Sequence, residues 1–186
     1  IISTVLGTAA SFTLVRNQFW GKNLILSIIL LPQIIPFIIV AISLYFFFAQ
    51  LHLIGNWIIV ALGHAVLALP FVVVIVSTSL KGFDRTVEYA AMNLGANQFK
   101  TYLRITFPLM RPAILVSALF AFMTSFDELL VALFLGGERS ATIPKRMWEG
   151  LRYDINPTIA VVASMLIIFS FTMLFLIEIL RRRSKT

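Results

Sequence analysis

Five apolar blocks separated by short polar connectors dominate this sequence and restrict it to one kind of fold. The blocks cover residues 1–15, 24–50, 57–79, 113–135 and 157–180. A helix needs about 20 predominantly apolar residues to cross a bilayer, and backbone amides inside lipid must be hydrogen-bonded within their own segment. We therefore expect an all-α, polytopic transmembrane bundle that forms a single domain over residues 1–186.

The composition agrees with a membrane chain and excludes several kinds of site. Hydrophobic residues make up 60% of the chain and charged residues only 12%, whereas soluble domains carry about 25% charged residues. The sequence has no cysteine, which excludes disulfides and thiolate metal sites. Its two histidines, His52 and His64, are too few for a histidine metal cluster, and His64 is predicted to be a helix-packing residue. We expect no metal site.

The first apolar block is too short for a complete crossing. The sequence opens with Ile1 inside an apolar run, and no charged segment precedes it, so the block does not resemble a signal peptide. We expect that block 1–15 is a truncated span and that an earlier segment is missing.

The basic residues predict an orientation in the membrane. Eleven Lys and Arg residues lie in connectors 16–23, 80–112 and 181–186. Four lie in connectors 51–56 and 136–156. Because basic residues concentrate on the cytoplasmic side, the first group and the C-terminus are predicted to be cytoplasmic, and 136–156 is predicted to be an outer loop. The net charge of +7 follows this topology, so the expected surroundings are membrane lipid and not nucleic acid.

The connector 80–112 is the largest break in hydrophobicity and predicts two short amphipathic helices. Asp84 and Glu88 would fall in the first turn of the first helix, where carboxylates favour the helix dipole. Gly95 stands where a helix C-cap is expected. The apolar stripe of this helix recurs at helical spacing and consists of Val87, Ala90, Ala91 and Leu94.

The second helix of this connector is expected to end at Pro108, because proline cannot continue a helix. Its apolar stripe consists of Phe99, Tyr102, Leu103 and Thr106. Two interpretations of the helix pair stay open. It rests on lipid headgroups, as basic amphipathic helices commonly do, or it is a docking lever for a soluble partner.

The spacing Ala90-Ala91-x-x-Leu94-Gly95 followed by Ile105-x-x-Pro108 resembles the EAA loop of ATP-binding-cassette importer permeases. That family pattern is Glu-Ala-Ala, a Gly four residues after the second Ala, and Ile-x-Leu-Pro beginning ten residues after the Gly. This chain departs from it at two positions. Tyr89 stands at the place of the motif Glu, with Glu88 one residue early, and Phe107 replaces the Leu. A shift of one residue rotates a side chain by about 100° around a helix.

The resemblance extends over nearly the whole chain. The stretches "LPFVVVIVSTSLKGFD" and "SFDELLVALFLGG" resemble the polyamine (spermidine/putrescine) branch of these permeases. The resemblance implies a multi-pass protein of the cell (inner) membrane with the type I importer permease fold. Its implied partners are a second permease, two ATP-binding-cassette ATPase subunits and an extracytoplasmic substrate-binding protein. The implied ATPase-coupling residues are Glu88, Tyr89, Ala90, Ala91, Leu94, Gly95, Ile105 and Pro108.

The chain is not expected to be an enzyme or to bind a cofactor itself. It lacks the G-x-x-x-x-G-K-[ST] phosphate loop, because Gly21-Lys22 has no upstream Gly at the required spacing. If transport is driven by ATP, then ATP and Mg must be bound by the partner subunits.

Asp127 and Glu128 lie inside the apolar block 113–135. A carboxylate there costs about 2.5–3.5 kcal/mol on insertion scales, so it should face protein or water and is a candidate functional site. We expect a substrate pathway for a cationic amine, in which a carboxylate replaces the water lost by the ammonium group. The candidate pathway residues are Asp127, Glu128, Thr124, Ser125 and Tyr45, the last through its ring.

The alternative for these residues is structural. Both acids can be protonated or paired with Arg or Lys, and the small residues on the same helical side can be helix-packing contacts. That side consists of Ser117, Ala121, Thr124, Ser125, Glu128 and Ala132.

The outer loop 136–156 is predicted to contain one short helix. Thr142 can cap it, with Pro144 in its first turn. One side of the helix would carry Met147, Trp148 and Leu151. The helix rests on the membrane surface or, as the resemblance implies, meets the substrate-binding protein.

Three rival functions remain at this point. The chain could be the permease of an importer for another solute, such as ferric iron or an amino-acid-like amine. It could be an ATP-independent channel or secondary transporter. It could also be a membrane scaffold that transports nothing.

Overall fold

The computed structural model describes residues 1–153 and 157–183, and the regular structure in these residues is entirely helical, which confirms the all-α prediction. Residues 154–156 of the predicted outer loop and Lys185 at the predicted cytoplasmic end lie outside the described residues. The elements, in chain order, are α1 (Ile2–Arg16), α2 (Lys22–Ile34), α3 (Phe37–Gln50), α4 (Trp57–Lys81), α5 (Thr86–Asn93), α6 (Gln98–Thr101), the π-helix η1 (Tyr102–Thr106), α7 (Phe107–Phe126), α8 (Leu130–Leu135), the 3₁₀-helix η2 (Glu138–Ser140), α9 (Ile143–Tyr153) and α10 (Pro157–Arg183).

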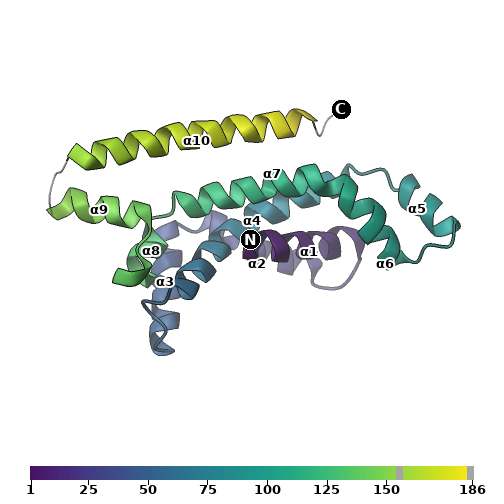
Figure 1. The fold of residues 1–186 in the computed structure, drawn as a ribbon. Coiled ribbons are helices and arrows are strands. Elements are labelled where there is room, and N and C mark those ends of the chain that lie inside the picture. The colour runs from purple at the N-terminus through teal and green to yellow at the C-terminus, as the bar shows by residue number, and fades with distance from the viewer. Residues whose placement is uncertain (154–156, 184–186) are drawn as a thin grey trace.

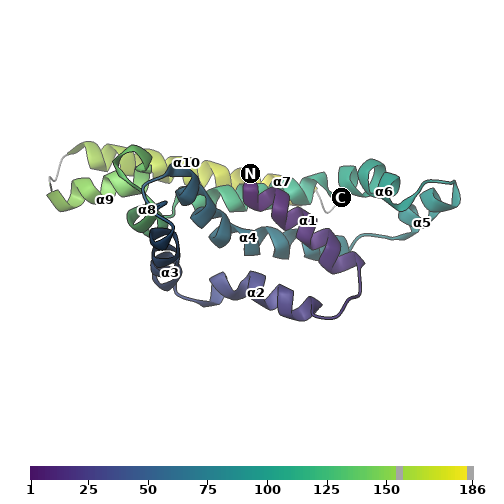
Figure 2. The same cartoon turned by 90° about the horizontal axis from the view of Figure 1, so that it is seen from below.

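Helices α1, α4 and α7 pack along the long axis of the molecule, with α4 between the other two (Figures 1 and 2). Helix α4 supplies the fully buried Val72 and Val76, and α7 supplies Ala113 and Ala121 to the same cluster. The hydroxyl of Ser11 on α1 donates to Val73 O of α4 over 3.3 Å. Small residues and such bonds let helices approach closely in a membrane, where helices gain little from the hydrophobic effect.

A second core joins α3, α4 and α8. Its buried members are Ala41, Ile59, Val60, Leu67, Val131, Ala132 and Leu135. At Gly63 of α4 an added Cβ would lie 2.6 Å from Cγ1 of Val131, so only glycine permits this approach of α8. This contact fixes α8 against the body of the bundle.

Three described helices are long and apolar enough to cross a membrane, namely Trp57–Lys81, Gln98–Phe126 and Thr158–Ile179. The α2–α3 pair adds a fourth crossing if the two helices form one broken span. Helix α1 is apolar but shorter than these.

The predicted single crossing over 24–50 is broken in the structure. Helix α2 ends at Ile34, α3 starts at Phe37, and the two axes differ by 109°. Pro36 lacks an N–H group, and its ring disfavours helical geometry at Ile35, whose ψ is 135°. Proline chemistry therefore turns the chain here rather than kinking a continuous helix.

The predicted end of a helix at Pro108 is also absent. Residues 98–126 form one continuous helical segment. In η1 the chain takes a wider turn, in which the N–H of Phe107 bonds to Tyr102 O. Pro108 directly follows this wider turn as the second residue of α7, and the helix continues through it.

The predicted span 113–135 is interrupted near its C-terminal end. Helix α7 stops at Phe126, and α8 begins at Leu130 with residues 127–129 between them. Asp127 and Glu128 therefore lie in a helix break and not on one face of a continuous helix.

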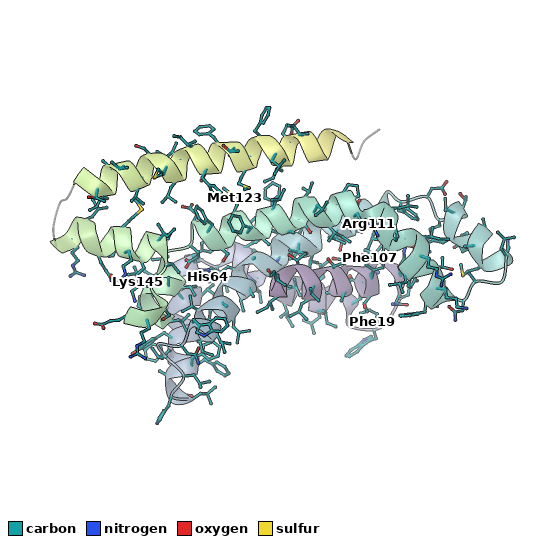
Figure 3. All side chains as sticks on the ribbon, in the orientation of Figure 1. Phe19, His64, Phe107, Arg111, Met123 and Lys145 are labelled. Carbon is teal, nitrogen blue, oxygen red and sulfur yellow. The ribbon has the colours of Figure 1, made fainter. Side chains whose placement is uncertain are left out.

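The connectors gather at two ends of the molecule. The end of α1, the end of α4, the α5–α6 segment and the C-terminal end of α10 lie toward one end, and α3, α8 and α9 lie toward the other (Figures 1 and 2). Helix α10 runs along α7, with Met123 of α7 between the two (Figure 3). Phe19 projects from the connector after α1.

Close contact between α1 and α4 predicts a specific sensitivity at Gly7. An added Cβ would lie 2.7 Å from Cγ1 of the fully buried Val72, so Gly7→Ala should lower stability by about 1–3 kcal/mol, as overpacking does. Thermal unfolding of the detergent-purified chain, followed by tryptophan fluorescence, measures this effect.

Gly82→Ala is the matched control, because a Cβ there would lie at an ordinary 3.7 Å from Ser79 O and φ is −80°. Equal unfolding midpoints for the two variants would contradict the close approach of α1 to α4.

Candidate functional site

The α5 helix begins and ends through local hydrogen bonds that the sequence specifies. The Asp84 carboxylate accepts bonds from the N–H of Thr86 over 2.9 Å and from its hydroxyl over 2.8 Å. Asp84 thus precedes the helix rather than lying in its first turn. Because both bonds favour the charged form, the pKa of Asp84 lies below its usual value.

Gly95 ends α5 in the left-handed conformation, with φ at 90°. The N–H of Ala96 bonds to Ala91 O over 3.1 Å, and the N–H of Gly95 bonds to Met92 O over 3.0 Å. These two bonds form a Schellman motif, in which glycine avoids the penalty that a Cβ would bring. Asn97 then starts α6 by accepting a bond from the N–H of Lys100.

The α5–α6 segment exposes several apolar side chains. Leu94 is 89% exposed and Tyr89 is 53% exposed. Val87 and Phe99 are exposed as well, and Ala90 lies on the accessible side, while Ala91 is buried. Exposed apolar patches mark sites of interaction with proteins or membranes. The predicted coupling residues Ile105 and Pro108 are half-buried on η1 and α7, next along the chain.

Glu88, although part of α5, faces the body of the protein. Its Oε1 lies 2.6 Å from an Arg16 guanidinium nitrogen and accepts a 2.7 Å bond from the hydroxyl of Thr106. The Arg16 and Glu88 side chains are only 3% and 6% exposed. Glu88 and Tyr89 therefore point in different directions, as adjacent residues on a helix must.

Glu128 holds the start of the short helix α8. Its two carboxylate oxygens accept bonds from the N–H of Leu130 over 3.0 Å and of Val131 over 2.7 Å. At the other end of α8, the buried Lys145 ammonium donates to Gly136 O over 2.6 Å. A carboxylate at the N-terminus and an ammonium at the C-terminus both complement the helix dipole.

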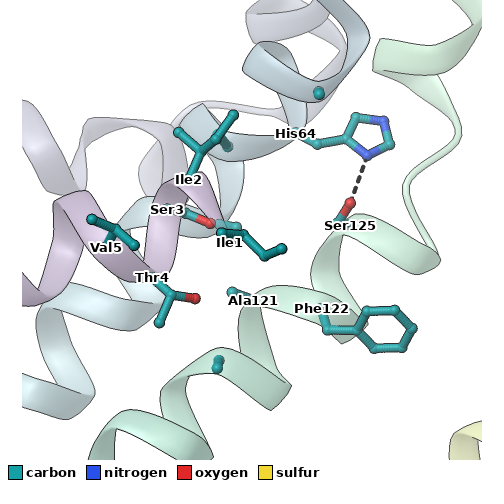
Figure 4. Close-up of a pocket in the computed structure, with 13 residues that line it drawn as sticks. Ile1, Ile2, Ser3, Thr4, Val5, His64, Ala121, Phe122 and Ser125 are labelled. Atoms are coloured by element: carbon teal, nitrogen blue, oxygen red, sulfur yellow. Dashed lines mark hydrogen bonds between the residues drawn. The ribbon is translucent and has the colours of Figure 1, made fainter. Parts of the chain in front are cut away.

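His64 connects α4 to the break between α7 and α8. Its Nδ1 lies 2.9 Å from the Ser125 hydroxyl (Figure 4), and its Nε2 lies 3.7 Å from Oε2 of Glu128. The structure thus brings together two predicted pathway residues, Ser125 and Glu128, through a histidine that the sequence predicted only to pack between helices. His64 and Ser125 are separated by 61 positions, so no local spacing could have paired them.

Two neighbouring cavities meet at this histidine. The first, of about 490 Å³, lies between α1, α4 and α7 and is lined by Ser3, Thr4, Ala121 and Ser125, among others (Figure 4). The second, of about 330 Å³, shares His64, Phe122 and Ser125 with the first and also contacts Trp57, Ser140 and Thr142. Together they form a mostly apolar space with a few hydroxyl groups.

The remaining predicted pathway residues lie apart from these cavities. Asp127 is exposed in the helix break, and the Thr124 hydroxyl donates to Phe120 O of its own helix. Tyr45 packs against the Phe134 ring, with the ring centroids 6.3 Å apart. None of these three lines the two cavities. Among the described residues, no three His, Asp or Glu side chains are grouped to hold a metal ion.

The predicted outer helix is present as α9. The N–H of Lys145 bonds to the Thr142 hydroxyl over 3.4 Å, and Pro144 is in the first turn. Trp148 and Leu151 are exposed. The α9 surface is therefore available to a partner or to lipid.

Comparison with known proteins supplies the context for this geometry. The family model described as "Binding-protein-dependent transport system inner membrane component" matches residues 3–186. This match confirms the resemblance to importer permeases that the segment 90–108 predicted.

Several curated relatives are similar to most of the chain. The putrescine transport system permease protein PotI of Escherichia coli (strain K12) is 34% identical over 172 residues, which cover 89% of this chain and 61% of the relative. The spermidine/putrescine transport system permease protein PotC of the same strain is 30% identical over 181 residues, covering 97% and 68%. The diacetylchitobiose uptake system permease protein DasC of Streptomyces coelicolor is 25% identical over 145 residues, covering 77% and 52%. The chain spans about three fifths of the length of PotI.

The bonds made by Glu128 predict that it matters more to stability than its neighbour. Glu128→Ala removes both acceptors from the start of α8 and should destabilise the chain by about 1–3 kcal/mol, the cost of unsatisfied buried donors. Asp127→Ala, at an exposed position, should change stability by no more than about 0.5 kcal/mol. Thermal unfolding in detergent compares the two variants. A larger loss from Asp127→Ala would contradict the assignment.

Proposed function

The chain belongs to the family of binding-protein-dependent transport system inner membrane components, and from this premise we propose that it is the membrane permease subunit of an ATP-driven importer. The match over residues 3–186 is the observation that carries the proposal. In this role the chain transports and is not an enzyme. Its fold is that of a type I importer permease, and the α5–α6 segment is the EAA-type coupling loop.

The geometry of α5 supports this role. A docking helix must expose a face to a soluble partner and yet be held firmly by the membrane body. Tyr89 on α5 and Leu94 directly after it are exposed, while Glu88 on the same helix is buried against Arg16. A helix resting on lipid headgroups needs no such buried ion pair, so the docking interpretation is favoured over the interfacial one.

The assembly then contains a second permease, two ATP-binding-cassette ATPase subunits that bind ATP and Mg, and an extracytoplasmic substrate-binding protein. The α5 end is cytoplasmic, because the connectors with most basic residues gather there. The α9 end faces outward and receives the loaded binding protein. Closure of the ATPases moves α5, and α5 moves the bundle between its outward-open and inward-open states.

A polyamine, or a related cationic amine, is the proposed cargo. The sequence identity is 34% to a putrescine permease and 30% to a spermidine/putrescine permease, against 25% to a diacetylchitobiose permease. Asp127 is an exposed carboxylate near the outer end of α7 and can pair with an ammonium group. Glu128, whose oxygens hold α8, lies 3.7 Å from His64, which bonds to Ser125 beside the two cavities.

The exposed face of α5 predicts the result of a binding experiment. Leu94→Glu places a charge at an 89% exposed apolar position and should abolish co-purification of the ATPase subunits, since an unpaired charge in an apolar interface costs more than its contacts contribute. Mass spectrometry of the affinity-purified chain identifies the subunits that remain bound.

Leu53→Glu is the matched control, because Leu53 is 40% exposed in a connector at the opposite end. It should leave ATPase binding unchanged. Retention of the ATPase by the Leu94→Glu variant, or uptake by the chain alone in liposomes without any ATPase, would overturn the proposed coupling role.

A test of the cargo uses Asp127 in the reconstituted complex. Asp127→Asn removes the proposed exposed ion pair between Asp127 and the ammonium group of the cargo. Such a pair contributes about 0.2–1 kcal/mol, which corresponds to a fall of up to about fivefold in putrescine uptake. Asp127→Glu keeps the charge and should restore most of the uptake. Equal uptake by the wild type and the Asn variant at equal expression would remove the argument for a cationic cargo, and ferric iron or an amino-acid-like amine would then be tested.

A further inference from the structure

A single carboxylate oxygen joins three segments that are distant in the sequence. Oε1 of Glu88 receives both the Arg16 guanidinium and the Thr106 hydroxyl, at 2.6 Å and 2.7 Å. Arg16 is the last residue of α1, Glu88 belongs to α5, and Thr106 ends the π-helix that continues into α7. We call these three residues the junction.

The junction is closed to solvent, so each charge depends on the other. The Arg16 and Glu88 side chains are 3% and 6% exposed, and Thr106 is fully buried. The Arg16 guanidinium also lies 5.7 Å from the centroid of the Phe83 ring, in the link between α4 and α5. Removal of one partner from a buried ion pair leaves an uncompensated charge, which is strongly unfavourable.

Few other contacts hold α5 to the bundle. Helix α5 packs mainly on its chain neighbours α6 and η1, and its opposite face carries the exposed Tyr89 and Leu94. Within the described residues, Glu88 is the side chain through which α5 bonds to the rest of the bundle: the Arg16 guanidinium of α1 and the Thr106 hydroxyl at the end of η1 both donate to it. Thr106 extends this bond into α7, the helix that carries Ser125 beside the cavities.

The geometry leads us to infer that the junction is a mechanical joint, in which Glu88 ties the coupling helix α5 to α1 and α7 so that α5 cannot move without moving both. Glu88 acts within the chain as a positioning residue, while the neighbouring Tyr89 and Leu94 remain free for a partner. The π-helix at Thr106 fits this assignment, because π-turns occur frequently at functional sites. The joint rests on the proposed function for its role in transport, but its mechanical part can be tested without it.

The first test measures the position of α5 in the chain alone. The sequence has no cysteine, so spin labels can be attached at Ala90→Cys on α5 and Leu115→Cys on α7, both accessible positions. Pulsed electron resonance in lipid nanodiscs should give one narrow distance distribution for the otherwise unaltered chain. Glu88→Gln should broaden it clearly. Equally wide distance distributions in the two chains would contradict the inference that Glu88 holds α5 in place.

The double variant Arg16→Glu with Glu88→Arg exchanges the two charges and tests whether the narrow distance distribution returns. It restores opposite charges in the same place and should narrow the distribution again. A distribution that stays as broad as that of Glu88→Gln would show that the charge pair does not hold α5.

The second test measures coupling in the reconstituted complex, as substrate taken up per ATP hydrolysed. Glu88→Gln should lower this ratio by about tenfold, within the range by which residues between two sites alter their coupling, while the ATPase subunits stay bound. If the substitution only reduced the amount of folded complex, uptake and hydrolysis would fall together and their ratio would stay unchanged. That result would contradict the inferred role of the junction in coupling.

Thr106→Val is the milder variant if Glu88→Gln does not fold, because it removes only the hydroxyl bond. It should lower the ratio in the same direction, and Thr106→Ser should restore it. Thr172→Val is the matched control, since the Thr172 hydroxyl donates to Ile168 O of its own exposed helix, and it should change nothing. If no ATPase binds the unaltered chain, the proposed function fails. The spin-label distances alone then decide whether Glu88 ties α5 to α1 and α7.

Discussion

The packing of α4 between α1 and α7 is the constraint on which the rest of the structure depends. Val72 and Val76 of α4 are completely buried, and Gly7 of α1 leaves room for Val72 that no larger residue would leave. In a bilayer, helices associate through such close packing and a few hydrogen bonds. Once these three helices are fixed, the segments at their ends have defined positions. The α5–α6 segment lies at one end, and the helix break with Glu128 lies near the other.

Side chains and proline chemistry decide where the chain can leave the helical conformation. Pro36 turns the α2–α3 pair, and a π-turn lets Pro108 enter α7 without ending the helix. Glu128 replaces the backbone bonds that are missing at the start of α8. Glu88 has the corresponding role at the other end, where it fastens α5 to the bundle. The two buried glutamates therefore stabilise two places where a helix of the bundle would otherwise lack partners.

The sequence predicted features that depend on local chemistry and missed those that depend on distant partners. The length of the apolar block 57–79 identified α4, and the preference for glycine at the C-terminal end of a helix identified the end of α5 at Gly95. The rotation of Glu88 toward Arg16 could not be predicted, because the ion pair joins residues 72 positions apart. The same reason hid the pairing of His64 with Ser125. The role of Glu128 was missed because a continuous helix was assumed across residues that form a break.

The central claim is that α5 is held from within by Glu88 and presents its outer face to a cytoplasmic ATPase. The most direct measurement is photo-crosslinking in intact cells from a benzoylphenylalanine placed at Leu94, the most exposed apolar residue of this segment. The account predicts an adduct with a nucleotide-hydrolysing subunit. An adduct with lipid alone, or with a protein on the outer side of the membrane, would contradict it.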